Sequence, residues 1–251
     1  MSSHHPEPPV SPARPATAVN PVTSLDDPRA ISLLSTEHWS LLSARSLAYN
    51  EAFARGGMFL SFLSMSFVAL ALLSQAMAFG GQFLTVTAVV LAFDLVIGLT
   101  TYGRISGANV DDLRAVHGMA RIRHAYIEIA PIVDRYFTSP THDDIPSLMT
   151  AYGAPSRSGL PELIYALNTS GGMIGLITSM VGGVLAAVLG LIFGVDGGMA
   201  VWIGVAGTLV VLVLLVVVTF GRVPKHQEAL GVLFPRETAA TDADGPAERD
   251  E

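Results

Sequence analysis

The sequence lacks cysteine and carries little charge. None of its 251 residues is cysteine, and only 14% are charged, against 51% that are hydrophobic. The missing cysteines exclude disulfide bonds, thiolate metal sites and a cysteine nucleophile. In soluble domains about a quarter of all residues are charged. The low charge, together with a mean hydropathy of +0.51, therefore indicates a membrane protein.

Basic residues are also scarce, which excludes one class of partner. The net charge is -7 and the pI is near 5.4, whereas nucleic-acid binding needs clustered Lys and Arg. Nor does the chain begin with the basic stretch, short apolar core and cleavage site of a secretory signal peptide. Residues 1–28 are instead rich in proline and poor in apolar side chains, so we expect them to form a disordered tail.

Four long apolar runs dominate the rest of the chain. A helix needs about 20 apolar residues to cross the hydrocarbon core, where every backbone polar group must be satisfied internally. The runs that meet this length are residues 58–78, 82–102, 172–194 and 199–220. Short glycine-containing turns join the first pair and the second pair. We therefore predict an all-α polytopic membrane protein built from two transmembrane hairpins, residues 58–102 and 172–220.

The distribution of basic residues predicts how the spans are oriented. Neither hairpin tip contains Lys or Arg, and all such residues lie in the N-terminal part, in residues 103–171 or in residues 221–251. By the positive-inside rule, both termini and the middle segment are cytoplasmic. Both hairpins then cross the membrane in the same direction. We expect the 221–251 tail to be disordered at its end.

The segment before the first span, residues 29–57, has apolar residues placed among polar ones. We expect a cytoplasmic or interfacial helix here that enters the first span, with Ser35 or Thr36 as its N-cap. In this interpretation Trp39 and Tyr49 lie near the lipid headgroups, where aromatic residues are enriched.

The middle segment, residues 103–171, is predicted to contain an amphipathic helix. Asn109 is a suitable N-cap with Asp112 at the third helical position, apolar residues then recur every three or four positions, and Pro131 is expected to bend the helix. A second, mostly cationic stripe also has helical spacing. Its members, called the cationic stripe below, are Arg114, His117, Arg121, His124 and Glu128.

The cationic stripe has two interpretations. It is either a site for anionic headgroups or a phosphorylated ligand, or a solvated face on which Glu128 pairs with His124 across one turn. His142, Asp143 and Asp144 also cluster, but the run THDDIP is more typical of a turn with a capped helix start. With no HExxH motif, we predict neither a metal nor another cofactor.

The third span contains small residues four positions apart, a pattern that lets helix backbones approach closely. The series is Gly171, Gly175, Ser179, Gly183 and Ala187, and the fourth span carries Ala200, Gly204 and Thr208 at the same spacing. This pattern favours packing between the third and fourth spans, and homo-oligomerisation is the alternative.

Asp94 is a single carboxylate near the centre of the second span. An ionised Asp there costs about 2.5 to 3.5 kcal/mol, which the surrounding apolar residues outweigh. Thr87, Asp94 and Thr101 are seven apart and share a face that we expect to point into the bundle. Residues of similar depth complete the predicted polar layer: Ser64, Ser66, Thr178, Ser179 and Thr208. Asp94 either ties the hairpins together by hydrogen bonds or binds a proton or cation.

Several stretches resemble a known group of proteins. The run TEHWSLLSARSLAYNEAFARGGMFLSFLS, then HGMARIRHAYIEIAPIVDRYF followed by THDD and AYG, resembles an uncharacterised family of actinobacterial integral membrane proteins. This resemblance covers about residues 35–220 and implies four spans in the plasma membrane, without an activity. The architecture is also distantly similar to the two-transmembrane effector domains of bacterial conflict systems, thought to act as pores, although the second hairpin departs from them.

Two functional hypotheses follow. The first is a non-enzymatic membrane module that binds a cytoplasmic protein or an anionic lipid through its cytoplasmic helices. The alternative is an ion- or proton-conducting oligomer that uses Asp94. An intramembrane enzyme is disfavoured because the spans offer no paired base, nucleophile or metal-binding set.

Overall fold

The computed structural model describes residues 22–77, 80–153, 167–220 and 231–236, and every regular element in these ranges is a helix. The disordered tail predicted for residues 1–28 and the disordered end of the chain fall largely outside the described residues; of that tail, residues 22–27 are described and are not helical, and Pro28 starts the first helix. Four helices are long: α1 (Pro28–Met77), α2 (Gly81–Ile129), α5 (Ser170–Ile192) and α6 (Gly197–Phe220). The short elements are the 3-10 helix η1 (Pro131–Tyr136) and α3 (Ile145–Thr150).

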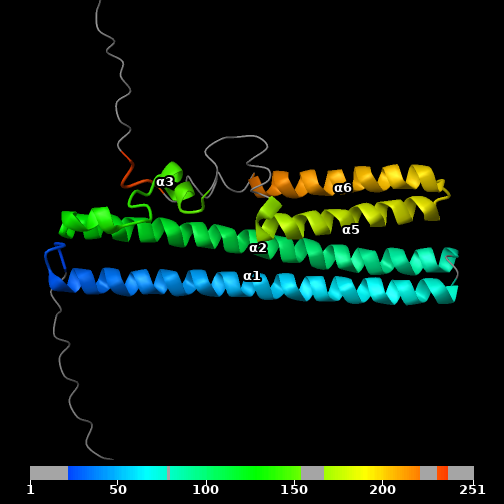
Figure 1. Ribbon diagram of the computed structural model, residues 1–251, viewed down its shortest axis with the longest axis horizontal. Coiled ribbons are helices and arrows are strands. Elements are labelled where there is room, and N and C mark those ends of the chain that lie inside the picture. Colours follow the sequence, from blue (N-terminus) through cyan, green and yellow to red (C-terminus); the bar gives the residue numbers. More distant parts are fainter. Residues whose placement is uncertain (1–21, 78–79, 154–166, 221–230, 237–251) are drawn as a thin grey trace, which may run out of the picture.

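The long helices form two antiparallel hairpins whose tips lie at the same end of the molecule (Figure 1). α2 packs against both α1 and α5, and α5 packs against α6. The hairpin of α1 and α2 is much longer than the other one, so α5 and α6 accompany only the half near its tip. α3 lies beside the other half of α2 (Figure 1).

All four long helices are long and apolar enough to cross a membrane, which confirms the predicted number of candidate spans. α6 lies at one edge of the arrangement and buries least of its surface within the protein. Its exposed side chains, among them Val201, Trp202, Leu209 and Val213, are apolar. An apolar outward face of this kind is what a lipid-facing helix requires.

The first helix starts earlier than predicted. α1 begins at Pro28, and the Oδ1 of Asp27 accepts a hydrogen bond of 2.9 Å from the backbone N–H of Arg29. A carboxylate before the helix and proline at its first position are both favourable start signals. The predicted cap at Ser35 or Thr36 is therefore wrong: both lie inside α1, and the Thr36 hydroxyl bonds to the carbonyl of Ser32.

The predicted helix start at Asn109 is also wrong, because α2 runs without interruption from the apolar region through Asn109 to Ile129. Asp112 consequently lies in a helix interior. Nor does Pro131 bend the helix. α2 ends before it, since the residue preceding a proline is driven out of the helical conformation. Ala130 accordingly has φ −146° and ψ 84°, and Pro131 starts η1.

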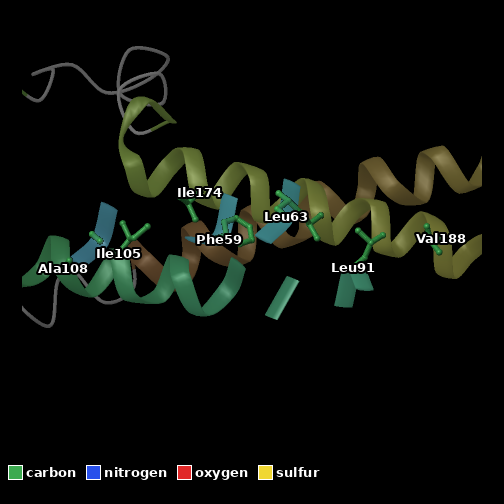
Figure 2. Packing of buried hydrophobic residues seen from close by; sticks show 9 residues of the cluster. Phe59, Leu63, Leu91, Ile105, Ala108, Ile174 and Val188 are labelled. Carbon is green, nitrogen blue, oxygen red and sulfur yellow. The ribbon is translucent and has the colours of Figure 1, made fainter. Parts of the chain in front are cut away.

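The apolar core follows the contact between α1, α2 and α5. Figure 2 shows its buried side chains spaced along these helices, with Phe59 of α1 close to Ile174 of α5. The buried members are Ala52, Phe59, Leu63, Leu91, Ile105, Ala108, Ile174, Val181 and Val188. This core fixes the depth and the rotation of α2, and so the direction in which Asp94 points.

Candidate functional site

Asp94 lies in the interior of the helix bundle. Its side chain is completely buried, and Thr87 and Thr101 on the same face of α2 are also buried, with 8% and 7% exposure. Ser66 of α1 donates a hydrogen bond of 3.0 Å to the Oδ1 of Asp94. The Oδ2 of Asp94 has no hydrogen-bond partner within the described part of the chain. Asp94 thus links α1 to α2 and leaves one carboxylate oxygen unused.

Only part of the predicted polar layer surrounds Asp94. Thr178 of α5 is fully buried, and its side chain lies against Gly98, one turn of α2 from Asp94: a Cβ added to Gly98 would be 2.7 Å from the Oγ1 of Thr178. Like Asp94 Oδ2, this hydroxyl has no partner among the described residues. Ser179 is equally buried, but it donates to the carbonyl of Gly175 in its own helix.

The other two members of that layer lie elsewhere. Ser64 is exposed and bonds to the carbonyl of Leu60, since it is two residues from Ser66 and therefore on another face of α1. The Thr208 hydroxyl donates to the carbonyl of Gly204 and sits in the contact between α5 and α6. Of the predicted layer, only Ser66 and Thr178 therefore lie near Asp94. Ser179 is buried next to Thr178 but bonds within its own helix.

The small residues of α5 pack against two different helices, α2 and α6. Gly171 lies against Asn109 and Ile105 of α2, and Gly175 against the ring of Tyr102. Further along, Gly183 and Ala187 meet Gly204, while Ala200 of α6 is buried as well. Residues four apart advance by 400°, so such a series turns about 40° per step around the helix. The series thus faces α2 first and α6 later.

The cationic stripe is largely occupied by the chain itself. The Nε of Arg121 donates to the Oδ2 of Asp143 at 2.8 Å, and its Nη2 donates to the carbonyl of Gly231 at 2.6 Å. His117 is buried, with its Nε2 3.5 Å from the same Asp143 oxygen. His124 lies 3.6 Å from Glu128, the pair expected for a solvated face. Arg114 is exposed and pairs with Asp111.

Residues 231–236, called the docked segment below, cover the part of this stripe around Arg121 and His124. The backbone N–H groups of Leu233 and Phe234 donate to the two carboxylate oxygens of Asp143 at 2.9 and 2.8 Å. The N–H of Asp143 donates in return to the carbonyl of Phe234, whose ring stacks on His124 with centroids 4.1 Å apart. A segment more than 80 residues away in sequence thus closes part of the face that was predicted to be open.

Two pKa shifts follow from this docking. Burial lowers the pKa of His117 below its usual 6.5, and the charge of Arg121 lowers it further. Burial alone would raise the pKa of Asp143, but the hydrogen bonds from Leu233, Arg121 and Phe234 together hold the pKa below 3.8. At neutral pH His117 is therefore uncharged and Asp143 is a carboxylate.

Asp144 caps a helix, as the run THDDIP suggested. Its Oδ2 accepts a hydrogen bond from the N–H of Ser147 at the start of α3, and its Oδ1 accepts one from the N–H of Arg236. Within the described residues no group of three His, Cys, Asp or Glu side chains is placed to hold a metal ion.

A buried cluster around Asp112 was missed by the sequence reasoning. The carboxylate of Asp112 accepts hydrogen bonds from Arg45 and Tyr49 of α1 and from Tyr152, which follows α3; the two tyrosine contacts are 3.0 and 2.7 Å. Burial and the neighbouring carboxylate raise the pKa of Tyr152 far above its usual value. The only signal in the sequence was an acidic residue on the face of α2 that also carries Ala108 and Ala115.

Comparison of the chain with protein-family models, with curated proteins and with solved structures finds no match in any of the three. The resemblance to actinobacterial membrane proteins stays a prediction, and function has to be argued from the geometry alone.

Proposed function

We propose that this protein is a non-enzymatic integral membrane protein of a bacterial plasma membrane, and that the cytoplasmic half of its long hairpin binds a protein partner. The observation that carries this proposal is the continuity of α1 and α2. Beyond the apolar spans, α2 continues from Arg104 to Ile129, which is about 39 Å of helix at 1.5 Å per residue. The hairpin therefore projects well beyond the membrane surface.

This projection separates the exposed aromatic residues of α1 from the lipid. Trp39 lies about 28 Å along the axis from Met58, where the first span begins. The headgroup layer on each side of a bilayer is only about 5 to 8 Å thick. A straight hairpin places Trp39 outside that layer, in contrast to the interfacial position expected from the sequence. Tyr49 is turned inward, because its hydroxyl bonds to Asp112.

The cytoplasmic half of α1 exposes several large apolar side chains. Leu33, Trp39 and Leu47 are each more than 60% exposed. Large apolar side chains that face water in a rigid element are typical of protein interfaces, where Trp contributes strongly to binding. The Asp112 cluster supplies the rigidity, since it joins α1, α2 and the turn after α3.

Photo-crosslinking in intact cells tests the partner. A photoreactive amino acid at Trp39 should give one discrete adduct with another protein, whereas the same group at exposed Arg114 of α2 should give none. Absence of an adduct at Trp39, or equal labelling at both positions, would refute the proposal. An adduct with twice the mass of the chain would show that the partner is a second copy of this chain.

The orientation is tested separately. Because the chain contains no cysteine, single cysteines can be introduced without background. A cysteine at Gly80 or Gly197, in the hairpin tips, should react with a membrane-impermeant maleimide in intact cells, and one at Asp111 should react only after lysis. The reverse pattern would overturn the cytoplasmic assignment of the long hairpin.

One observation favours a second candidate function, ion or proton conduction by an oligomer. Asp94 is fully buried among apolar helices, and both its Oδ2 and the nearby Thr178 hydroxyl lack partners in the described residues. Unsatisfied polar groups at such depth are costly and often mark ion pathways. A proton or cation flux into liposomes that Asp94→Asn abolishes would establish this function, and equal flux with and without protein would exclude it.

A further inference from the structure

A groove lies between α1 and α2 at the cytoplasmic end of their apolar spans. Its volume is about 300 Å³. The lining residues are Arg55, Met58, Phe59 and Phe62 of α1 and Ile97, Thr100 and Thr101 of α2. The groove is thus lined mainly by apolar side chains, with two threonines on its α2 side and a basic residue at one end.

The basic end carries an ion cluster that joins the two helices. The Nε of Arg55 donates to the Oε1 of Glu51 at 3.0 Å, while Arg104 donates to both oxygens of Glu51 at 2.9 and 2.7 Å. Arg104 lies one turn beyond Thr100, a residue of the groove, and it binds the same carboxylate as Arg55. Two cations share one carboxylate, and the cluster therefore has a net charge of +1.

This charge is fixed at every physiological pH. Hydrogen bonds from Arg104 and Arg55 lower the pKa of Glu51 to about 2, so the carboxylate does not take up a proton. Both arginine side chains are about half exposed. Within the described residues Arg55 meets Glu51 through Nε, which leaves its two terminal nitrogens for a further acceptor.

The depth of the cluster matches a lipid headgroup. In the orientation given under the proposed function, on which this inference rests, Arg55 lies about 4.5 Å from the start of the first span at Met58. Arg104 lies about 3 Å beyond the end of the second span. Both fall within the headgroup layer of about 5 to 8 Å. The apolar floor of the groove, from Met58 to Phe62, then faces the acyl chains.

We propose that this groove binds one anionic phospholipid of the cytoplasmic leaflet, with its phosphate on Arg55 and Arg104 and part of an acyl chain between Met58 and Phe62. Charge complementarity selects the headgroup, and the apolar lining selects a lipid over free phosphate. The site is separate from the cationic stripe, of which the docked segment covers Arg121 and His124.

The test is a lipid titration of the purified full-length protein, followed by native mass spectrometry with phosphatidylglycerol and with phosphatidylcholine. Arg55→Gln and Arg104→Gln should each weaken phosphatidylglycerol binding about fivefold, and Glu51→Gln should strengthen it about fivefold, because each changes the local charge by one. Phosphatidylcholine binding should not change. Arg114→Gln, an exposed arginine about ten residues further along α2, is the matched control and should have no effect.

Met58→Trp fills the groove and should weaken the binding of both lipids, which keeps the proposal testable if an arginine variant fails to fold. Four results would overturn the proposal: no preference for phosphatidylglycerol, an effect of Arg114→Gln equal to that of Arg55→Gln, weaker binding after Glu51→Gln, or displacement of the lipid by inorganic phosphate. The measurement involves no protein partner, so failure of the crosslinking at Trp39 leaves its result unaffected.

Discussion

Arg45 of α1 and Asp112 of α2 form an ion pair in the half of the long hairpin that lies beyond the apolar spans, with Nε and Oδ1 2.5 Å apart. Asp112 is buried, whereas the Arg45 side chain keeps 30% of its exposure. Two tyrosine hydroxyls donate further hydrogen bonds to the carboxylate of Asp112. A buried carboxylate needs such partners, because an unpaired one would be strongly destabilising.

Removal of this charge should loosen the half of the hairpin that lies beyond the apolar spans. Asp112→Asn breaks a partly buried ion pair, and we expect a loss of about 2 to 3 kcal/mol, below the full cost of a completely buried pair because Arg45 is partly screened by solvent. Hydrogen exchange of residues 40–50 and 108–118 measures the effect. Tyr152→Phe, which removes one hydrogen bond to a charged group, should cost less. Equal exchange in Asp112→Asn and the parent would contradict the role of the cluster.

Acid should release the docked segment. The pKa values of both His117 and Asp143 are lowered in the folded protein. A group with a lowered pKa stabilises the fold above its unfolded pKa and loses that contribution as the pH falls through its folded pKa. The contribution of His117 should therefore begin to fade below pH 6.5, and that of Asp143 only below about pH 4.

Spin labels can follow this release, because single cysteines are easily introduced. With labels at exposed Val232 and Arg114, the distance distribution should broaden between pH 7 and pH 5. His117→Gln removes the titrating group and should leave the distribution unchanged over this range. A parent protein whose distribution is the same at both pH values would show that His117 does not control docking.

The hydrogen bond between Ser66 and Asp94 should tolerate the loss of the charge but not of the polar side chain. Asp94→Asn can still accept from Ser66, so its thermal stability in detergent should stay within about 1 kcal/mol of the parent. Asp94→Leu leaves the buried Ser66 hydroxyl without this partner and should cost about 1 to 3 kcal/mol. If Asp94→Asn and Asp94→Leu destabilised the protein equally, the negative charge of Asp94 itself would be needed.

The contact between α5 and α6 is so close that adding a single methyl group there should destabilise the protein. A Cβ at Gly183 would lie 2.5 Å from the carbonyl oxygen of Gly204 and closer still to the Oγ1 of Thr208. Gly183→Ala should therefore cost about 1 to 3 kcal/mol by overpacking. Gly57→Ala is the control, since nothing lies within 4 Å of its Cβ position. A Gly183→Ala protein with the parent's melting temperature would refute this contact.

Elements whose cause is local can be predicted from the sequence alone. Apolar runs longer than about 20 residues predicted the four candidate spans, and the seven-residue spacing of Thr87, Asp94 and Thr101 predicted a buried face. The run THDDIP also predicted a capped helix start, because a cap depends on neighbours only three residues apart.

Features that depend on residues far apart in the chain are set by tertiary packing instead. Asn109 offers a good start signal, yet α2 continues through it, since its neighbours Ala108 and Ile105 pack into a core shared with α1 and α5. Packing of this kind routinely overrides weak local preferences. Likewise, the spacing of His117 and Arg121 predicts an exposed cationic face. In the folded protein Asp143 lies beside both residues, and the docked segment binds Asp143 and Arg121. No periodicity within α2 encodes that contact, because its partners are far away along the chain and are brought together only by folding.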